Sequence, residues 1–203
     1  MYTNSFILSQ MNESLIAYTP THRVKSATTL TVEKERAQRS RSDSVLPLTY
    51  HIYNQCVEQS PILGFEPSTM LFAECLQLAT EKCDFLLNEF VIMNNHYHLL
   101  VQTVEGGTPI PKIMWLIKQT FSKYLNKIQG QKGTHWSRRY GCKIVEQQKN
   151  PQLYIMTLLG YLGYNPIKAG MVMDFESYRF SSIPRYLNAD FSPIIPVTMH
   201  PAY

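Results

Sequence analysis

The most regular pattern of hydrophobic and polar positions lies in residues 90–101, Phe-Val-Ile-Met-Asn-Asn-His-Tyr-His-Leu-Leu-Val. Two hydrophobic runs flank a polar centre, and the segments on either side of that centre have the length of strands. The pattern predicts strands over residues 83–93 and 97–103. Asn94 and Asn95 lie between them, which suits a tight hairpin turn because Asn tolerates the backbone conformations of turns.

The returning strand of this hairpin would carry two histidines on one face. Side chains alternate along a strand, so His96 and His98 would point to one side of the sheet and Tyr97 to the other. Neutral imidazole nitrogens are common metal ligands, and a strand holds them rigidly. Ordinary half-exposed polar residues can have the same spacing, so the hypothesis of a metal site depends on the rest of the chain.

Three further elements follow from shorter patterns. Residues 49–54 alternate and are rich in aromatic and β-branched side chains, which predicts a first strand. Hydrophobic residues recur at helical spacing after Ser68 and again from about residue 108 to residue 128, and both stretches predict helices. Residues 135–146 indicate a mixed strand or loop.

The last predicted helix carries a second group of candidate residues. Asn150-Pro151 is a strong helix start, because a capping side chain precedes proline at the first helical position. The helix is expected to run to about residue 164, and Pro166 is expected to end it. Tyr161 and Asn165 are four residues apart and therefore lie on one face.

This order of elements predicts an α+β fold, a ferredoxin-like sandwich in which helices back one antiparallel sheet. The 203 residues suffice for one sizeable domain, expected over residues 47–186. Residues 1–46 lack sustained periodicity, so a poorly ordered extension is expected there, with at most a short helix near residues 32–39. Residues 187–203 are rich in proline and are expected to form an extended tail.

Composition narrows the class of protein. Hydrophobic residues make up 44% of the chain and charged residues 17%, as in globular proteins. No hydrophobic run has the length of a membrane span and the N-terminus does not resemble a signal peptide, so a cytoplasmic location is expected. The four cysteines form no Cys-x-x-Cys pair and are expected to be buried free thiols.

Positive charge is concentrated in one part of the chain, although the net charge is only +4. Residues 47–110 contain one basic residue, Lys82, and seven acidic residues. Residues 111–149 contain nine Lys or Arg and one acidic residue, Glu146. This local excess indicates a polyanionic partner, because each phosphate that is neutralised releases a condensed counterion.

Seven of these nine basic residues fall into two groups. The first could equally be the solvated face of a helix, and it comprises Lys112, Lys118, Lys123 and Lys127. The second comprises Arg138, Arg139 and Lys143, which lie among the aromatic side chains of Trp136 and Tyr140, where guanidinium groups and rings can stack on bases.

Colinear segments in four parts of the chain, the last of them in two pieces, resemble the signature of one family. Residues 93–101 resemble the His-hydrophobic-His (HUH) motif of single-tyrosine, IS200-like transposases. Residues 160–172, Gly-Tyr-Leu-Gly-Tyr-Asn-Pro-Ile-Lys-Ala-Gly-Met-Val, and 178–182, Tyr-Arg-Phe-Ser-Ser, look like the Tyr-x-x-x-Asn-Pro-x-(Lys/Arg)-Ala-Gly and Tyr-x-(Trp/Phe)-Ser-Ser signature of REP-associated tyrosine transposases. Residues 136–140, Trp-Ser-Arg-Arg-Tyr, are similar to the Trp-x-x-Arg-Tyr segment of that branch, and residues 50–54 to its opening strand.

The resemblance implies a metal-dependent enzyme that cleaves and rejoins DNA through a 5′-phosphotyrosine bond. Tyr161 would be the nucleophile, His96 and His98 would be metal ligands, and Asn165 would complete the metal site from the helix. The implied metal is Mg²⁺ or Mn²⁺. His51 is a candidate neighbour of the metal.

The implied substrate is single-stranded DNA with a short hairpin, as in repetitive extragenic palindromes. A monomer or a homodimer would bind it, and a nucleoid-associated protein is expected. The helix lysines would steer the DNA backbone, while the arginine-rich segment would read or stack bases. Lys143 and Lys168 are further candidate DNA contacts.

Three other functions are weighed against the transposase. A DNA-binding regulator that has lost cleavage is disfavoured because His96, His98 and Tyr161 are all present. A replication-initiation or relaxase-type nickase would share these residues, but the Asn-Pro-x-Lys-Ala-Gly run favours a transposase. A metal-dependent hydrolase is the weakest alternative, since no second cluster of carboxylates or histidines accompanies the pair.

Overall fold

The computed structural model describes residues 45–137 and 139–202. The expected short helix near residues 32–39, residues 1–44 of the expected extension and the role assigned to Arg138 lie outside these ranges. The elements in chain order are β1 (Thr49–Gln55), the 3-10 helices η1 (Val57–Gln59) and η2 (Ile62–Gly64), α3 (Glu66–Lys82), β2 (Phe85–Ile92), β3 (His96–Thr103), α4 (Ile110–Gln129), β4 (Gly141–Ile144), α5 (Pro151–Lys168) and the 3-10 helix η3 (Ile183–Tyr186).

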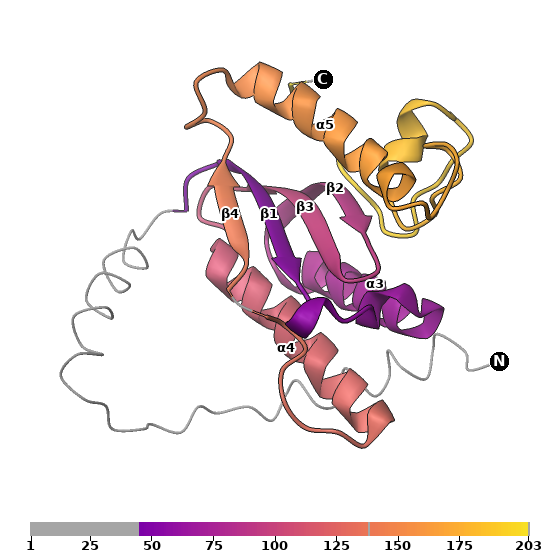
Figure 1. Cartoon of the computed structure of the whole chain (residues 1–203). Helices are drawn as coiled ribbons and strands as arrows, with labels where there is room; N and C mark the ends of the chain where they lie inside the picture. Colours follow the sequence, from indigo (N-terminus) through magenta and orange to yellow (C-terminus); the bar gives the residue numbers. More distant parts are fainter. Residues whose placement is uncertain (1–44, 138, 203) are drawn as a thin grey trace. The chain divides into compact units, whose positions relative to one another are not determined.

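The strands form one antiparallel sheet in the order β2-β3-β1-β4. Figure 1 shows α3 and α4 on one face of this sheet and α5 on the other. The predicted α+β sandwich, with helices backing an antiparallel sheet, is confirmed. β3, which carries both histidines, is paired on both sides by β1 and β2.

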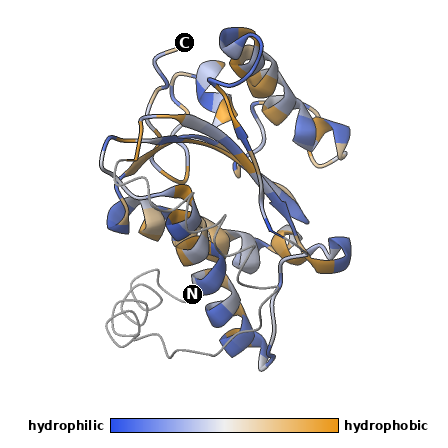
Figure 2. Cartoon of the chain, turned by 90° about the vertical axis from the view of Figure 1, so that its left-hand side faces the viewer, coloured by the Kyte–Doolittle hydropathy of each residue, from blue (hydrophilic) through white to orange (hydrophobic). Residues whose placement is uncertain are grey.

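Aromatic rings fill the core between the sheet and α3 and α4. Tyr97 has no exposed surface, and its ring centroid lies 4.7 Å from that of Phe72 and 5.4 Å from that of Trp136. Phe121 of α4 contacts both Phe72 and Trp136. In the side view of Figure 2, hydrophobic residues lie along the strands and on the neighbouring sides of the helices, as expected for amphipathic elements.

A second hydrophobic core holds α5 against the opposite face. Its buried members come from β2, β3, α5 and the segments next to them, and they are Val91, Met93, Leu100, Val145, Ile155, Leu158, Leu162, Tyr178 and Ile183. Burial of a large apolar side chain contributes about 1.5–3 kcal/mol. This core therefore fixes the position of α5 relative to β3.

The predicted hairpin is present. β2 and β3 pair antiparallel, and Met93 N–H donates to the carbonyl oxygen of His96 at 2.8 Å across the turn. Asn94 and Asn95 form the turn, and His96 is the first residue of β3. The two histidines thus lie at the start of the returning strand, as the sequence predicts.

α5 begins as predicted but ends later. The Asn150 side chain accepts a hydrogen bond from Leu153 N–H at 3.0 Å, and Pro151 is the first helical residue. The prediction that Pro166 ends the helix is wrong, because α5 continues to Lys168. Pro166 is buried in the last turn, where its missing N–H removes a single helical hydrogen bond, and its carbonyl accepts from Met171 N–H.

Two smaller expectations also need correction. α3 begins at Glu66 rather than at Ser68, since Pro67 suits the first helical turn. The cysteines are free, as predicted, but Cys142 on the edge strand β4 is exposed rather than buried. Within the described ranges, no helix is both long and hydrophobic enough to cross a bilayer.

The segment after α5 closes the outer edge of β2. Ile92 N–H donates to Phe180 O and Ser182 N–H donates to Phe90 O, so residues 180–182 pair with β2 like a short additional strand. Pairing of this kind removes the unpaired backbone groups that make an edge strand prone to aggregation.

The carboxylate of Glu89 anchors this closing segment. Glu89 has no exposed surface, and it accepts hydrogen bonds from Ser182 Oγ, from the Tyr186 hydroxyl and, at 2.7 Å, from Arg185 Nη2. A buried carboxylate is tolerated only when it is paired, so these partners tie the segment to the interior of β2.

Replacing Arg185 by Met is expected to destabilise the protein by about 3–5 kcal/mol, because the buried carboxylate of Glu89 would lose its ion pair with Arg185. Arg179→Met is the matched control. Arg179 forms an ion pair with Glu66 at 2.9 Å, but the two side chains are 55% and 64% exposed, so a loss of about 0–1 kcal/mol is expected. Urea unfolding measures both free energies, and equal losses would contradict the anchoring role of Glu89.

Candidate active site

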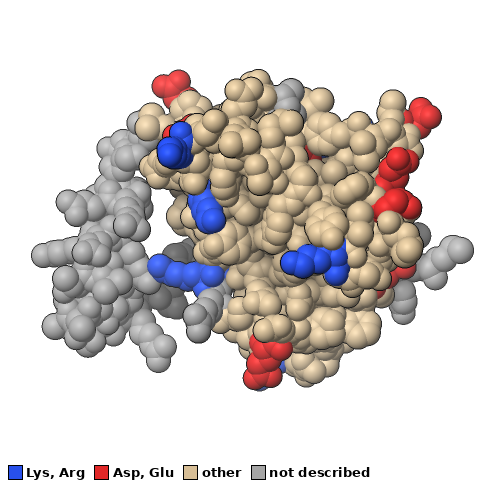
Figure 3. Space-filling model, turned by 45° about the horizontal axis from the view of Figure 1, so that its top comes forward, with Lys and Arg blue, Asp and Glu red and all other residues tan. Residues whose placement is uncertain are grey.

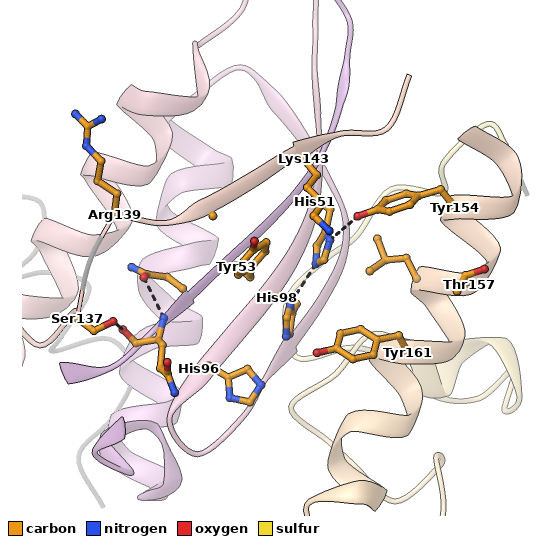
Figure 4. Close-up of a pocket in the computed structure, with 14 residues that line it drawn as sticks. His51, Tyr53, His96, His98, Ser137, Arg139, Lys143, Tyr154, Thr157 and Tyr161 are labelled. Atoms are coloured by element: carbon orange, nitrogen blue, oxygen red, sulfur yellow. Dashed lines mark hydrogen bonds between the residues drawn. The ribbon is translucent and has the colours of Figure 1, made fainter. Parts of the chain in front are cut away.

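An open cavity of about 670 Å³ lies between α5 and the sheet (Figure 4). It contains both predicted histidine ligands and the predicted nucleophile. Its lining residues are His51, Tyr53, Asn54, Gln55, His96, His98, Ser137, Arg139, Gly141, Lys143, Tyr154, Thr157, Leu158 and Tyr161.

The two β3 histidines lie side by side in this cavity. Their ring centroids are 5.2 Å apart and the ring planes are nearly perpendicular, at 89°. Burial lowers the pKa of His98 to about 3, with His51 and His96 as further causes, and burial also lowers the pKa of His96. Both imidazoles are therefore neutral near pH 7, which is the form that binds a metal ion.

His98 is hydrogen-bonded to a side chain of β1, which is in turn hydrogen-bonded to a side chain of α5. His98 Nδ1 lies 3.1 Å from His51 Nε2, and His51 Nδ1 lies 2.9 Å from the Tyr154 hydroxyl oxygen (Figure 4). Burial, and to a smaller extent Lys143, lowers the pKa of His51 to about 4, so this imidazole is also neutral.

The remaining nitrogens of the two predicted ligands suit a metal ion. His98 Nε2 is buried and has no hydrogen-bond partner in the described part of the chain. His96 Nδ1 lies 2.7 Å from Asn95 Oδ1, which places the hydrogen on Nδ1 and leaves a lone pair on Nε2. Among the described residues no group of three His, Cys, Asp or Glu is placed to hold a metal, so a metal ion bound to these two imidazoles would need further ligands of another kind.

Tyr161 places a phenol beside His98. The two ring centroids are 5.3 Å apart at 85°, and the phenol points toward the histidines in Figure 4. Tyr161 is 46% exposed, whereas Leu158 and Leu162 on the same helix are buried in the core.

Asn165, one turn further on, does not line the cavity; its Nδ2 is buried without a partner among the described residues. The role of Asn165 as a ligand stays a prediction.

A second open cavity of about 640 Å³ lies along α4. Its lining includes five of the predicted DNA-binding residues, namely Lys118, Lys123, Trp136, Arg139 and Tyr140. Arg139 lines both cavities. Trp136 is only 4% exposed, so most of its ring is buried in the core.

The other predicted DNA-binding residues lie apart from the second cavity. Lys143 lines the first cavity. Lys112, Lys127 and Lys168 are exposed and line neither cavity.

Sequence reasoning missed Tyr53 and Tyr154 as cavity residues and identified His51 only as a neighbour of the metal. The signals are present in the chain. His51 and Tyr53 alternate on β1 and therefore share a face, and Tyr154 lies seven residues before Tyr161 on the same face of α5.

The family model described as "Transposase IS200 like" matches residues 44–157, which is more than half of the chain. The chain belongs to the IS200-like transposase family. The matched residues include His96 and His98 but end before Tyr161, so the assignment of Tyr161 depends on its geometry in the cavity. A comparison with curated proteins finds no match.

A solved REP-associated tyrosine transposase bound to a REP hairpin resembles this IS200-like transposase with a TM-score of 0.58. The match covers 80% of this chain and 94% of that chain at 20% identity, a level that shows a shared fold. A candidate transposase from Deinococcus radiodurans R1 is 14% identical over 58% of this chain and 92% of that chain, with a TM-score of 0.40, and supports no further conclusion.

We expect that only glycine fits at position 141, because the Tyr53 ring lies where a side chain would begin. Gly141 pairs with Tyr53, and a Cβ at this position would lie 2.2 Å from Tyr53 Cζ. Gly141→Ala should therefore displace the Tyr53 ring and destabilise the protein by about 1–3 kcal/mol. The loss should disappear in a Tyr53→Ala background, which urea unfolding of the four proteins measures.

Gly160 provides a control of opposite sign. It lies within α5, and no atom is within 4 Å of the position of its Cβ. Gly160→Ala is expected to stabilise the protein by about 0.5–1 kcal/mol through helix propensity. A loss at Gly141 that persisted without the Tyr53 ring would refute the steric explanation.

Proposed function

We propose that this IS200-like transposase cleaves and rejoins single-stranded DNA by attack of Tyr161 on a phosphodiester. The observation that carries the proposal is the contact between the rings of Tyr161 and His98, 5.3 Å apart, in a cavity that His96 also lines. A tyrosine on a helix surface is ordinarily a packing or surface residue. Its position beside two neutral imidazoles that suit a metal ion favours a catalytic role.

His96 and His98 are the residues that would hold a divalent metal ion, Mg²⁺ or Mn²⁺, through their Nε2 atoms. Such an ion, when bound, supplies positive charge that stabilises the oxygens of the attacked phosphate. Imidazole ligands suit Mn²⁺ well. The side-chain amide of Asn165, on the same helix as Tyr161, is the proposed further ligand from the chain.

The proposed reaction exchanges one phosphoester for another. The Tyr161 oxygen forms a bond to phosphorus and the phenol loses its proton, while the bond from phosphorus to the 3′ oxygen breaks and that oxygen takes up a proton. The DNA then carries a free 3′-OH, and the 5′-phosphate stays on Tyr161. Because the phosphoester energy is retained, a 3′-OH can attack this bond and rejoin DNA without ATP.

The surface around the cavities suits a DNA strand. Arg139 and Lys143 line the catalytic cavity, and Lys118 and Lys123 line the second cavity. On the face shown in Figure 3, Lys and Arg side chains lie from the left side to the centre, whereas Asp and Glu side chains lie mostly at the top, right and bottom margins. The REP-associated transposase of the same fold was solved with a REP hairpin, which supports a hairpin-bearing single strand as the substrate.

Incubation of the protein with a labelled single-stranded hairpin from the flanks of its own gene, with Mn²⁺ or Mg²⁺, is expected to yield a covalent protein–DNA adduct on a denaturing gel. Tyr161→Phe should abolish the adduct because it removes the nucleophilic oxygen. His96→Ala should lower the adduct yield by at least about 100-fold because it removes a metal ligand. Tyr164→Phe is the matched control, since Tyr164 lies on α5 and is 53% exposed but does not line the cavity.

Two outcomes would contradict the proposal. An adduct that persisted in Tyr161→Phe would place the nucleophile elsewhere. Tight binding of the hairpin without any adduct or metal dependence would identify a DNA-binding regulator.

Arg139 is expected to contribute to sequence preference because it borders both cavities. Arg139→Gln should reduce the discrimination between a hairpin with its natural flanking bases and one with substituted flanks, by about 5-fold or more. Lys112→Gln removes the same charge from an exposed position on α4 and should weaken both complexes equally. Fluorescence anisotropy at several salt concentrations measures the affinity of each variant for the two hairpins. A change in salt dependence alone for Arg139→Gln would contradict a role in base reading.

A further inference from the structure

His51 and Tyr154 form a polar chain that attack by Tyr161 does not itself require. The chain joins three elements, since Tyr154 lies on α5, His51 on β1 and His98 on β3. His51 and His98 are each only 6% exposed, so water cannot easily replace the bond between them. Burial of polar side chains lowers the stability of a protein unless all of them are hydrogen-bonded, so their presence here suggests a functional role.

Only one distribution of hydrogens in this chain leaves His98 able to bind a metal ion through Nε2. A neutral imidazole carries one hydrogen. When Nε2 of His98 bears a lone pair, the hydrogen is on Nδ1 and is donated to His51 Nε2. The hydrogen of His51 is then on Nδ1 and is donated to the Tyr154 hydroxyl oxygen.

The reverse distribution fits the structure less well. If Tyr154 donated to His51 and His51 donated to His98 Nδ1, the hydrogen of His98 would be on Nε2. That atom is buried and has no hydrogen-bond partner in the part of the chain described here. A buried donor without an acceptor is unfavourable, so the surroundings favour the hydrogen distribution that suits a ligand.

We infer that His51 is a positioning residue that holds His98 in the tautomer and ring orientation for metal binding, and that Tyr154 orients His51 in turn. The inference depends on the proposed function, because it takes His98 as a metal ligand. Partners that donate to or accept from the second nitrogen of a ligating histidine typically change metal affinity by about 10–100-fold when they are removed.

Two substitutions of His51 separate its two hydrogen bonds. The side-chain amide of Gln reaches the position of Nε2 and that of Asn reaches the position of Nδ1. His51→Gln therefore preserves the bond to His98 and loses the bond to Tyr154, whereas His51→Asn does the reverse.

The measurement is the affinity for Mn²⁺ without DNA, by electron paramagnetic resonance of the free ion. His51→Gln is expected to bind within about threefold of the unchanged protein, and His51→Asn about 10–100-fold more weakly. Tyr154→Phe should cause a loss smaller than that of His51→Asn, because the bond from His51 to His98 persists. Thermal unfolding without metal identifies any variant that fails to fold.

His96→Ala separates failure of the inference from failure of the proposed function. If Mn²⁺ binding is the same in His96→Ala, the proposed metal site is wrong, and the inference falls with it. If binding falls in His96→Ala but His51→Asn binds as tightly as His51→Gln, only the inference is overturned.

Nitrogen-15 spectra of the histidine side chains test the inference without any substitution. With Mg²⁺ bound, His98 is expected in the tautomer that carries its hydrogen on Nδ1. A hydrogen on Nε2 of His98 under these conditions would overturn the inference.

Discussion

Antiparallel pairing of β1 with β3 is the interaction on which the candidate site depends. Tyr53 pairs with His98, and Gln55 pairs with His96. A slip of one residue in β3 would turn both histidines toward α3 and α4 and would expose Tyr97 in the cavity. The ring of Tyr97 resists such a slip, because it is fully buried against Phe72 and Trp136. The packing that stabilises one face of the sheet thus aims the imidazoles at the other.

The position of α5 depends on contacts far from the cavity. Leu158 and Leu162, on either side of Tyr161 along the helix, are buried in a core that Ile183 of the closing segment completes. That segment is held in turn by the buried carboxylate of Glu89. Because packed cores tolerate little displacement, loss of the Glu89 hydrogen bonds is expected to disturb the contact between the Tyr161 ring and His98.

The sequence predicts the local parts of this architecture well and the long-range parts poorly. The period of two around His96 and the cap at Asn150 are local signals, and the hairpin and the start of α5 follow from them. Pro166 misleads because burial of the last turn outweighs a local helix-breaking preference. Trp136 misleads because its basic neighbours suggest a surface, whereas contacts with rings distant in sequence bury it.

The candidate site shows the same division. The sequence resemblance points to Tyr161, His96 and His98 as the proposed nucleophile and ligands, but the partnership of His51 with Tyr154 is set by which residues of β1 and α5 meet across the sheet. Spacing along one element cannot reveal that meeting, since it depends on strand register and on the packing of α5. The structure therefore adds most where side chains from separate elements share one hydrogen bond.

The hydrogen-bonded side chains of His98, His51 and Tyr154 also favour the proposed cleavage of DNA over DNA binding alone. Burial lowers the pKa of His51 to about 4 and that of His98 to about 3. Both imidazoles therefore stay neutral in the folded protein at a mildly acidic pH at which they would be protonated in water. A module that only bound DNA would rely on exposed cations such as Arg139 and would lose nothing if apolar side chains filled this interior, as Leu100 does beside it. A buried imidazole nitrogen with no partner among the described residues is instead suited to hold a metal ion in the proposed phosphoryl transfer.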